Sequence, residues 1–369
     1  MKNLYDARKL EAARRIRAAG VGAMLITHLP DVQYLCGFTG SNAALIVFAG
    51  SRPATLFTDG RYIRQSKAQA VGTAVVIAGR ALVKEACELL AKSNIKSCGI
   101  DSAHTTLTAF ENFRKSLPAA RRSLFRPVAP LIQSQREIKD ATEIILMRKA
   151  ARLGCALYEH ILGFIDYGMT ELQVAAELEH EARIRGAEGM SFTTIVASGE
   201  RSAMPHGHAT SARLPRNGFI TLDFGVMLNG YCSDMTRTMY LGKPSTFERD
   251  TFEVVLAAQM AGVDAVAPGV ICAEVDEACR SILRRARLDK WFTHGTGHGV
   301  GLEIHEGPSV APGSKTILQP GMVVTVEPGV YISRRGMKDF GLRIEDEVLV
   351  KARGHEVLTA ASPKAWTAI

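Results

Sequence analysis

The stretch of residues 219–238 constrains the fold of this chain more strongly than any other. Two strand-like runs flank the dipeptide Asn229-Gly230, which is the strongest short-range signal for a two-residue hairpin loop. With that loop, Asp223 lies opposite Thr236 and is the diagonal neighbour of Asp234 on the same face. Diagonal neighbours have Cβ atoms roughly 7–8 Å apart or less. The stretch therefore predicts two adjacent carboxylates, and like charges this close call for a cation.

The opposite face of the first strand of this hairpin is apolar. Because side chains alternate between the two faces of a strand, four apolar residues share that face: Ile220, Leu222, Phe224 and Val226. Such a face can hold the hairpin on a hydrophobic core while the two aspartates point into a cavity.

Two further acids lie in strand-like segments nearer the end of the chain. The apolar run 323–326 ends on Glu327, and a proline-glycine turn then stops it. In the segment 342–349, period-two alternation places Arg343 and Glu345 on one face. Taken singly, an acid at a strand end is more often solvated than functional, so only the acids taken together indicate a functional site.

A glycine-rich segment, residues 294–306, carries three of the ten histidines: His294, His298 and His305. Glycines there let the backbone bend and approach a ligand closely. The segment does not have the G-x-G-x-x-G spacing of a phosphate-binding loop, and the chain contains no G-x-x-x-x-G-K-[ST] motif. We therefore do not interpret it as a nucleotide-binding site.

Together, four carboxylates and one imidazole form a hard, oxygen-rich ligand set. Such a set suits Mn²⁺ or a similar divalent ion better than metals that prefer thiolates. Four acids are more than one ion needs, whereas two ions that share carboxylates and a water molecule would neutralise them and generate hydroxide at neutral pH. The residues predict two divalent ions, with Mn²⁺ first and Co²⁺, Zn²⁺ or Fe²⁺ as alternatives.

The hydrophobic pattern divides the 369 residues near position 135, in keeping with a chain too long for one ordinary core. The first part alternates strands and helices, which predicts an α/β domain over residues 1–135. After a polar stretch, helices and strands each cluster, which predicts an α+β domain over residues 136–369. The predicted helices are 6–19, 61–70, 82–91, 140–164, 171–185, 247–265 and 273–287, and the early strands are 24–27, 43–48, 54–58 and 75–77.

Composition excludes several other classes of protein. The seven cysteines are odd in number, scattered and never spaced C-x-x-C, so we interpret them as buried thiols rather than disulfides or zinc ligands. The net charge of +8 comes from short basic clusters that are not interleaved with aromatic residues, unlike a nucleic-acid-binding stripe. The N-terminus lacks the pattern of a secretion signal, and no apolar run reaches the roughly 18 residues that span a bilayer. We expect a cytoplasmic protein that binds neither nucleic acid nor membrane.

The acids and the histidine segment resemble a known family. Their order and local contexts are similar to those of the metal ligands of the "pita-bread" metallopeptidases, which include methionine aminopeptidase, aminopeptidase P and prolidase, over residues 138–350. Segments 31–42 and 56–62 look like the creatinase/prolidase-type N-terminal domain, which methionine aminopeptidases lack. The chain therefore resembles Xaa-Pro aminopeptidase (aminopeptidase P) most closely, with Xaa-Pro dipeptidase (prolidase) next, and a pita-bread fold is implied for the C-terminal domain.

The resemblance implies a role for each metal ligand. In the family pattern, Asp234 and Glu345 bridge the two ions, Asp223 chelates one of them, and His298 and Glu327 bind the other. Glu327 is also implied as the general base that acts on the water molecule shared by the ions. No ligand departs from the pattern, so the sequence shows no sign of a degenerate enzyme.

The resemblance also implies the residues that meet the substrate. His206 and His305 are placed there to bind the carbonyl group or to shuttle protons, tasks that suit a side chain able to donate or accept near neutral pH. His294 and Arg343 are expected behind these residues or in the proline pocket, where the planar guanidinium can orient an acid or grip the substrate.

The activity implied is hydrolysis of the N-terminal Xaa-Pro peptide bond by a dinuclear centre that activates a bridging hydroxide, as in Xaa-Pro aminopeptidase. Prolidase, which cuts only Xaa-Pro dipeptides, is the alternative, and a non-catalytic pita-bread binding module is a remote third. The implied partners are a peptide with proline at the second position and a second copy of the chain in a homodimer. In relatives the N-terminal domain reaches a neighbouring active site, a task that would fall here to Arg61 and Tyr62.

Overall fold

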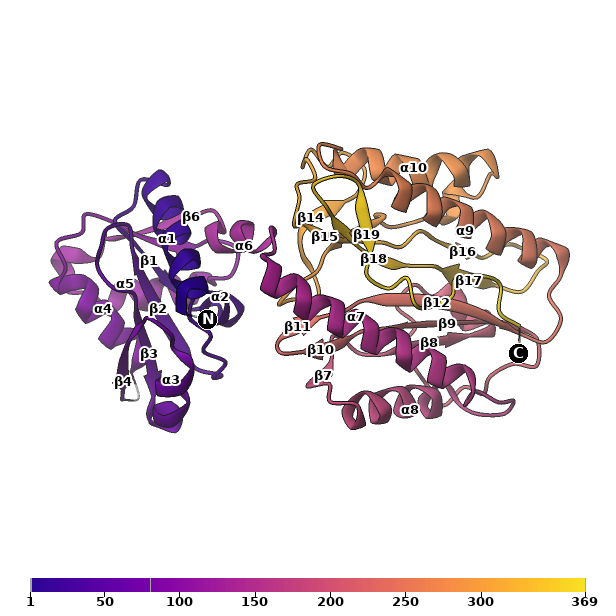
Figure 1. Cartoon of the computed structure of the whole chain (residues 1–369), viewed down its shortest axis with the longest axis horizontal. Helices are drawn as coiled ribbons and strands as arrows, with labels where there is room; N and C mark the ends of the chain where they lie inside the picture. The colour runs from indigo at the N-terminus through magenta and orange to yellow at the C-terminus, as the bar shows by residue number, and fades with distance from the viewer. Residues whose placement is uncertain (1, 80, 369) are drawn as a thin grey trace. The chain divides into compact units, whose positions relative to one another are not determined.

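The computed structural model describes residues 2–79 and 81–368 and consists of two compact units (Figure 1). The first unit ends at Arg136 and the second begins at Glu137. Each unit contains its own clusters of buried hydrophobic side chains, which is the physical property of a domain.

The first unit is an α/β domain around a six-stranded mixed sheet with the strand order β4-β3-β2-β1-β5-β6. The β1–β2 and β2–β3 pairs are antiparallel, and the β3–β4, β1–β5 and β5–β6 pairs are parallel. Parallel neighbours need a crossover connection, which α3 supplies between β3 and β4 and α5 between β5 and β6. The elements are α1 (Lys2–Ala18), β1 (Ala23–Ile26), α2 (Leu29–Cys36), β2 (Ala43–Phe48), β3 (Thr55–Asp59), α3 (Ile63–Gln69), β4 (Ala74–Ala78), α4 (Leu82–Lys92), β5 (Cys98–Asp101), α5 (Leu107–Lys115), β6 (Phe125–Val128) and α6 (Leu131–Arg136).

The division between the domains was predicted near residue 135, within a polar stretch, and the structure forms the helix α6 there. Arg136 Nη1 lies 2.6 Å from Asp31 Oδ1, and both side chains are buried. Gln135 Nε2 donates a hydrogen bond of 3.0 Å to the carbonyl oxygen of Arg8. Buried polar groups of this kind are stable when each finds a partner, and a hydrophobic pattern does not reveal such partners.

The second unit is an α+β domain in which two pairs of helices cover antiparallel sheets (Figure 1). The pair α7 and α8 packs with β8, β9, β10 and β12, and the pair α9 and α10 packs with β14 and β15. The helices are α7 (Ala141–Leu162), α8 (Glu171–Ile184), α9 (Thr246–Ala265) and α10 (Cys272–Arg285). The strands are β7 (Gly189–Met190), β8 (Ile195–Ser198), β9 (Gly218–Phe224), β10 (Val226–Leu228), β11 (Tyr231–Cys232), β12 (Met235–Leu241), β13 (Gly297–Gly299), β14 (Glu306–Val310), β15 (Val323–Val326), β16 (Gly329–Ile332), β17 (Phe340–Arg343), β18 (Asp346–Val350) and β19 (His355–Val357).

Side-chain caps fix where the helices of the second unit begin. At the start of α7, Asp140 Oδ1 accepts the backbone N–H of Thr142 at 2.8 Å, and Glu143 Oε2 accepts the backbone N–H of Asp140 at 3.0 Å. This reciprocal arrangement satisfies N–H groups that the helix cannot pair itself. The predicted helix start at residue 140 is confirmed.

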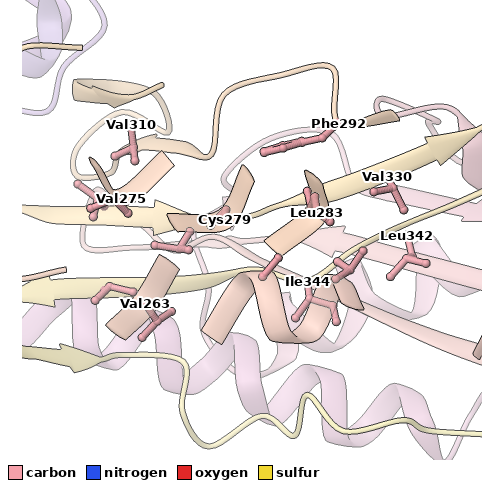
Figure 2. Close-up of a cluster of buried hydrophobic side chains, with 14 of the residues drawn as sticks. Val263, Val275, Cys279, Leu283, Phe292, Val310, Val330, Leu342 and Ile344 are labelled. Carbon is pink, nitrogen blue, oxygen red and sulfur yellow. The ribbon is translucent and has the colours of Figure 1, made fainter. Parts of the chain in front are cut away.

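The largest hydrophobic cluster of the second unit joins α9 and α10 to the strands beneath them (Figure 2). Gly262 lets the two helices lie close together, since a Cβ added at that position would lie only 2.3 Å from Cys279 Sγ. All seven cysteines are buried free thiols, which confirms their interpretation. None of the helices formed by the described residues is long and apolar enough to cross a membrane.

Candidate metal centre and substrate pocket

The hairpin that carries the two aspartates has the predicted register. Asp223 in β9 pairs with Thr236 in β12, and Asp234 immediately precedes β12. The loop residues Asn229 and Gly230 have φ angles of 51° and 80°, the left-handed region that a two-residue hairpin loop requires. The predicted apolar face is fully buried: Ile220, Leu222, Phe224 and Val226 each have 0% exposure.

Three more polar side chains reach the same place: His298 from β13, Glu327 from just after β15, and Glu345 from just before β18. Two threonines orient them. Thr325 Oγ1 accepts the backbone N–H of His298 at 3.0 Å and lies 3.2 Å from Glu327 Oε1. Thr236 Oγ1 lies 2.7 Å from Glu345 Oε2. Neither threonine was assigned a role from the sequence, although period-two alternation from Asp234 leads to Thr236 and from Glu327 to Thr325.

The acids and the imidazole form one cluster. His298 Nε2 lies 3.6 Å from Asp234 Oδ2 and 3.4 Å from Glu327 Oε1. One ligand atom each from Asp234, His298 and Glu345 all lie within 4.8 Å of one another. Donor atoms this close, drawn from three separate segments of the chain, are arranged as the ligands of a metal ion are.

Burial and mutual repulsion act strongly on these carboxyl groups. Burial, together with the charges of neighbouring carboxylates, raises the pKa values of Asp234 and Glu345 well above their ordinary range. Burial also raises the pKa of Glu327 to about 7, against the opposing effect of Arg343. Without added positive charge the set cannot be fully ionised near neutral pH, so a bound cation would relieve the repulsion.

Two observations test whether divalent ions fit this donor set. Asp223 Oδ1 and Glu345 Oε1 are buried and have no hydrogen-bond partner among the described residues, so each presents a lone pair for a ligand. His298 Nδ1 lies 3.0 Å from Gly299 O, which fixes its proton there and leaves Nε2 to face the carboxylates. Burial lowers the pKa of His298, so the ring stays neutral, as a metal ligand must. The residues fit hard divalent ions.

Arg343 is held by the protein through all three nitrogens of its guanidinium group. Its Nε donates to Thr236 Oγ1 at 3.1 Å and its Nη1 donates to Pro205 O at 3.1 Å and to Tyr331 Oη, while Nη2 donates to Asp223 Oδ2. The contact with Asp223 occupies one carboxylate oxygen and leaves the other for a metal. Arg343 therefore orients an acid of the cluster, one of the two tasks expected of it.

A hydrogen-bond chain continues from Arg343 to His294. Because a guanidinium can only donate, the oxygen of Tyr331 accepts from it and gives its own proton to His294 Nε2, 3.0 Å away. His294 Nδ1 then donates to Gly295 O at 2.7 Å. Burial and the charge of Arg343 lower the pKa of His294 to about 4. Both ring nitrogens of His294 therefore have hydrogen-bond partners within the protein. This favours a position for the side chain behind the substrate. Tyr331 was not predicted, because its link to this site depends on the β16–β17 pairing.

One pocket of about 660 Å³ contains the whole predicted set. It is lined by all nine predicted residues: His206, Asp223, Asp234, His294, His298, His305, Glu327, Arg343 and Glu345. Its wall also includes Phe192, Ile195 and Ile304, together with His208, to which no role was assigned. The rings of His298 and His305 lie 4.5 Å apart, centre to centre. Exposed histidines at an apolar pocket beside a metal-type cluster are suited to hold a peptide and move protons.

Arg61 and Tyr62 belong to the first unit. Arg61 is exposed and donates to both oxygens of Asp59 at 2.9 Å, and the hydroxyl of Tyr62 lies 2.6 Å from Ser41 Oγ. Their reach to a neighbouring subunit stays a prediction.

Comparison with known proteins identifies the family. Residues 145–352 match metallopeptidase family M24, and residues 8–138 match the Creatinase/Prolidase N-terminal domain. The chain belongs to metallopeptidase family M24. Membership in the M24 family confirms the resemblance, the pita-bread fold of the C-terminal part and the creatinase-type N-terminal part, and it makes the chain a hydrolase that uses divalent metal ions.

Several M24 relatives are similar over nearly their whole length. The chain is 34% identical to the Xaa-Pro dipeptidase of Pyrococcus horikoshii over 92% of this chain and 93% of that one. The structure of the Xaa-Pro dipeptidase from Bacillus anthracis has a TM-score of 0.92 and 37% identity, covering 98% of this chain and 99% of that one. The X-Pro aminopeptidase structure from Thermotoga maritima has a TM-score of 0.86 and 32% identity, covering 96% and 100%.

Proposed function

We propose that this M24 protein hydrolyses the peptide bond between a first residue and a following proline, and that Xaa-Pro dipeptides are its preferred substrates. The convergence of nine chemistry-bearing residues on one pocket carries the proposal of catalysis. From the sequence alone, Xaa-Pro aminopeptidase was the first prediction and prolidase the alternative. Similarity to Xaa-Pro dipeptidases, greater than that to the X-Pro aminopeptidase, favours prolidase activity instead.

In this proposal, residues 136–369 form the catalytic domain and hold two divalent ions, with Mn²⁺ as the first candidate. Asp223, Asp234, His298, Glu327 and Glu345 would hold these ions, with Asp234 and Glu345 shared between the two. When bound, the ions lower the pKa of a water molecule and polarise the scissile carbonyl group. A homodimer remains part of the proposal.

Glu327 serves as the general base in this scheme. Its Oε1 lies 3.2 Å from Thr325 Oγ1, which holds the carboxylate in one orientation. Arg343 lies 3.9 Å away through its Nε and keeps positive charge next to it. A base held in this way takes up a proton without a change in its own geometry, which is the condition for efficient proton transfer.

His206 and His305 divide two tasks on the substrate. One N–H donates to the carbonyl oxygen, where negative charge develops in the transition state. The other ring supplies a proton to the proline nitrogen, which carries no hydrogen in the peptide and must gain one when the bond breaks. Burial and two neighbouring histidines lower the pKa of His305, so a neutral ring with one N–H donor predominates at pH 7.

The test compares three peptides: Ala-Pro, Ala-Pro-Ala and Met-Ala-Ser. Product release is measured with chelator-stripped protein and with the same protein reloaded with Mn²⁺. We expect metal-dependent cleavage of Ala-Pro and little cleavage of the other two. Cleavage of Ala-Pro-Ala would make the protein an aminopeptidase P, and inactivity on all three peptides with metal bound would overturn the proposed substrate class.

A further inference from the structure

Outside the pocket, one buried carboxylate, that of Glu171, forms hydrogen bonds with both ends of the loop that carries His206. Glu171, the first residue of α8, is fully buried. Its Oε1 accepts the backbone N–H and the hydroxyl of Ser198, both at 2.9 Å. Its Oε2 accepts the backbone N–H of Thr210 at 3.1 Å and the hydroxyl at 2.8 Å. Residues 198 and 210 bracket the loop, so a single side chain ties its two ends together.

Arg201, within the loop, connects this carboxylate to the histidines. Its Nε lies 3.0 Å from Glu171 Oε2 and 3.2 Å from Oε1, and its Nη2 donates to His208 O at 2.8 Å. On the pocket side, Arg343 Nη1 donates to Pro205 O at 3.1 Å. The carbonyl groups of Pro205 and His208, which flank His206, are therefore each held by a guanidinium group. One guanidinium binds from the pocket and the other from behind the loop.

The loop also packs tightly on β8. A Cβ added at Gly207 would lie 2.8 Å from the Cβ of Ala197, and the backbone N–H of Gly207 donates to Met204 O at 3.1 Å. Ser202 Oγ accepts the backbone N–H of Gly341 at 3.0 Å. With so little free space beneath the loop, a shift at either end moves the imidazole of His206.

We propose that Glu171, acting with Arg201, is a positioning residue for the substrate-facing histidine His206. This inference rests on the proposed function, in which His206 meets the substrate. Neither Glu171 nor Arg201 lines the pocket, so both act through the loop rather than on the peptide.

The geometry requires a carboxylate at position 171. Each oxygen of Glu171 faces a backbone N–H, that of Ser198 or that of Thr210, and a backbone N–H cannot become an acceptor. In Glu171→Gln, the amide NH₂ must therefore oppose one of these donors whichever way the side chain is turned. One end of the loop is released in either orientation.

The experiment measures kcat and KM for the best of the three peptides, Mn²⁺ content, and hydrogen exchange of the amides in residues 199–210. The variants are Glu171→Gln and Arg201→Met. The second removes a side chain that is 28% exposed and serves if the first does not fold. Glu143→Gln is the matched control, because Glu143 is also a buried carboxylate in the first turn of a helix, α7, and it bonds to Asp140 and Tyr231 rather than to this loop.

We expect Glu171→Gln and Arg201→Met to lower kcat by about 10- to 100-fold, the effect of displacing a catalytic group by around 1 Å. KM should change by less than about 3-fold, since the imidazole matters most where charge develops in the transition state. Mn²⁺ content should stay at the wild-type value, and residues 199–210 should exchange faster. Glu143→Gln should lower the melting temperature but leave kcat and the exchange of the loop unchanged.

Different outcomes separate failure of this inference from failure of the proposed function. An active wild type with folded variants of unchanged kcat overturns the positioning role and leaves the proposed function intact. An equal loss of kcat in Glu143→Gln also overturns it, because general destabilisation would then explain the effect. A metal-loaded wild type that cleaves none of the peptides overturns the proposed function, and the inference that rests on it falls too.

Discussion

Gly225 lets the two strands that carry Asp223 and Asp234 lie close together. A Cβ added at position 225 would lie 1.7 Å from the carbonyl oxygen of Ser233 and 2.6 Å from the carbonyl carbon. Carbon–oxygen contacts between adjacent strands measure about 3.3 Å or more. In Gly225→Ala the strands must therefore move apart locally by about 1.6 Å, the difference between 3.3 and 1.7 Å.

This displacement is large on the scale of metal coordination. Ligand distances in metal sites hold to within about 0.2 Å, and the movement of one aspartate relative to the other would exceed that several times. Loss of a group that only supports a ligand weakens metal binding by about 10- to 100-fold. Because Gly225→Ala moves a ligand itself, we expect at least a 100-fold weaker affinity for Mn²⁺.

The assay is calorimetric titration of metal-free protein with Mn²⁺, with circular dichroism to check folding. Gly154→Ala is the matched control, because its Cβ would lie 3.6 Å from Ser233 Oγ, an ordinary contact with the same residue. Gly154 lies inside α7, where alanine should stabilise the protein by about 0.5–1 kcal/mol and leave Mn²⁺ binding unchanged. Wild-type affinity and stoichiometry in folded Gly225→Ala would refute the reasoning.

Three further predictions concern single side chains of the site. Asp234→Ala should abolish activity and reduce bound Mn²⁺ measured by elemental analysis, because Asp234 is proposed to bridge both ions; unchanged metal content would contradict that role. His305→Ala should keep its metal and lose turnover, and full activity would remove the role of His305. The pKa of His294 is about 4 in the folded protein against 6.5 ordinarily, so stability that is present above pH 6.5 is lost as the pH falls from 6.5 to 4, by less than about 3 kcal/mol because the ring is partly exposed. Urea unfolding of metal-free His294→Gln should therefore depend less on pH over this range than that of the wild type; equal dependence would show that His294 does not stay neutral.

Local patterns were sufficient to predict most of the fold. The early strands β1 to β4 lie within one residue of the ranges predicted from apolar runs, and the hairpin at Asn229-Gly230 has the predicted register. These elements were predictable because the signals that define them, alternation and turn chemistry, lie within a few residues. The short helices α2 (Leu29–Cys36), α5 and α6 were missed, since segments this short show too little helical periodicity.

The supporting parts of the site could not be predicted for a different physical reason. Glu171 is surrounded by groups 27 to 39 residues away along the chain, and Tyr331 joins His294 from 37 residues away. Such contacts depend on how elements pack, not on any pattern within them. The candidate ligands could be named from the sequence because they belong to a resemblance whose members stand in a fixed order.

Whether the protein acts as a dipeptidase or as an aminopeptidase depends on the groups that bind the carboxyl side of the proline. Hydrolysis of the Xaa-Pro bond would use the same proposed metal ligands in either case, so the preference depends on the groups around the carboxyl side of the proline. Arg343 is the one arginine or lysine among the described residues that line the pocket. Four of its five N–H donors already serve Thr236, Pro205, Tyr331 and Asp223. Within the described pocket, the carboxylate of a dipeptide would therefore meet histidine side chains and at most one remaining N–H of this guanidinium. The preference for Ala-Pro over Ala-Pro-Ala measures how strongly these groups bind that carboxylate.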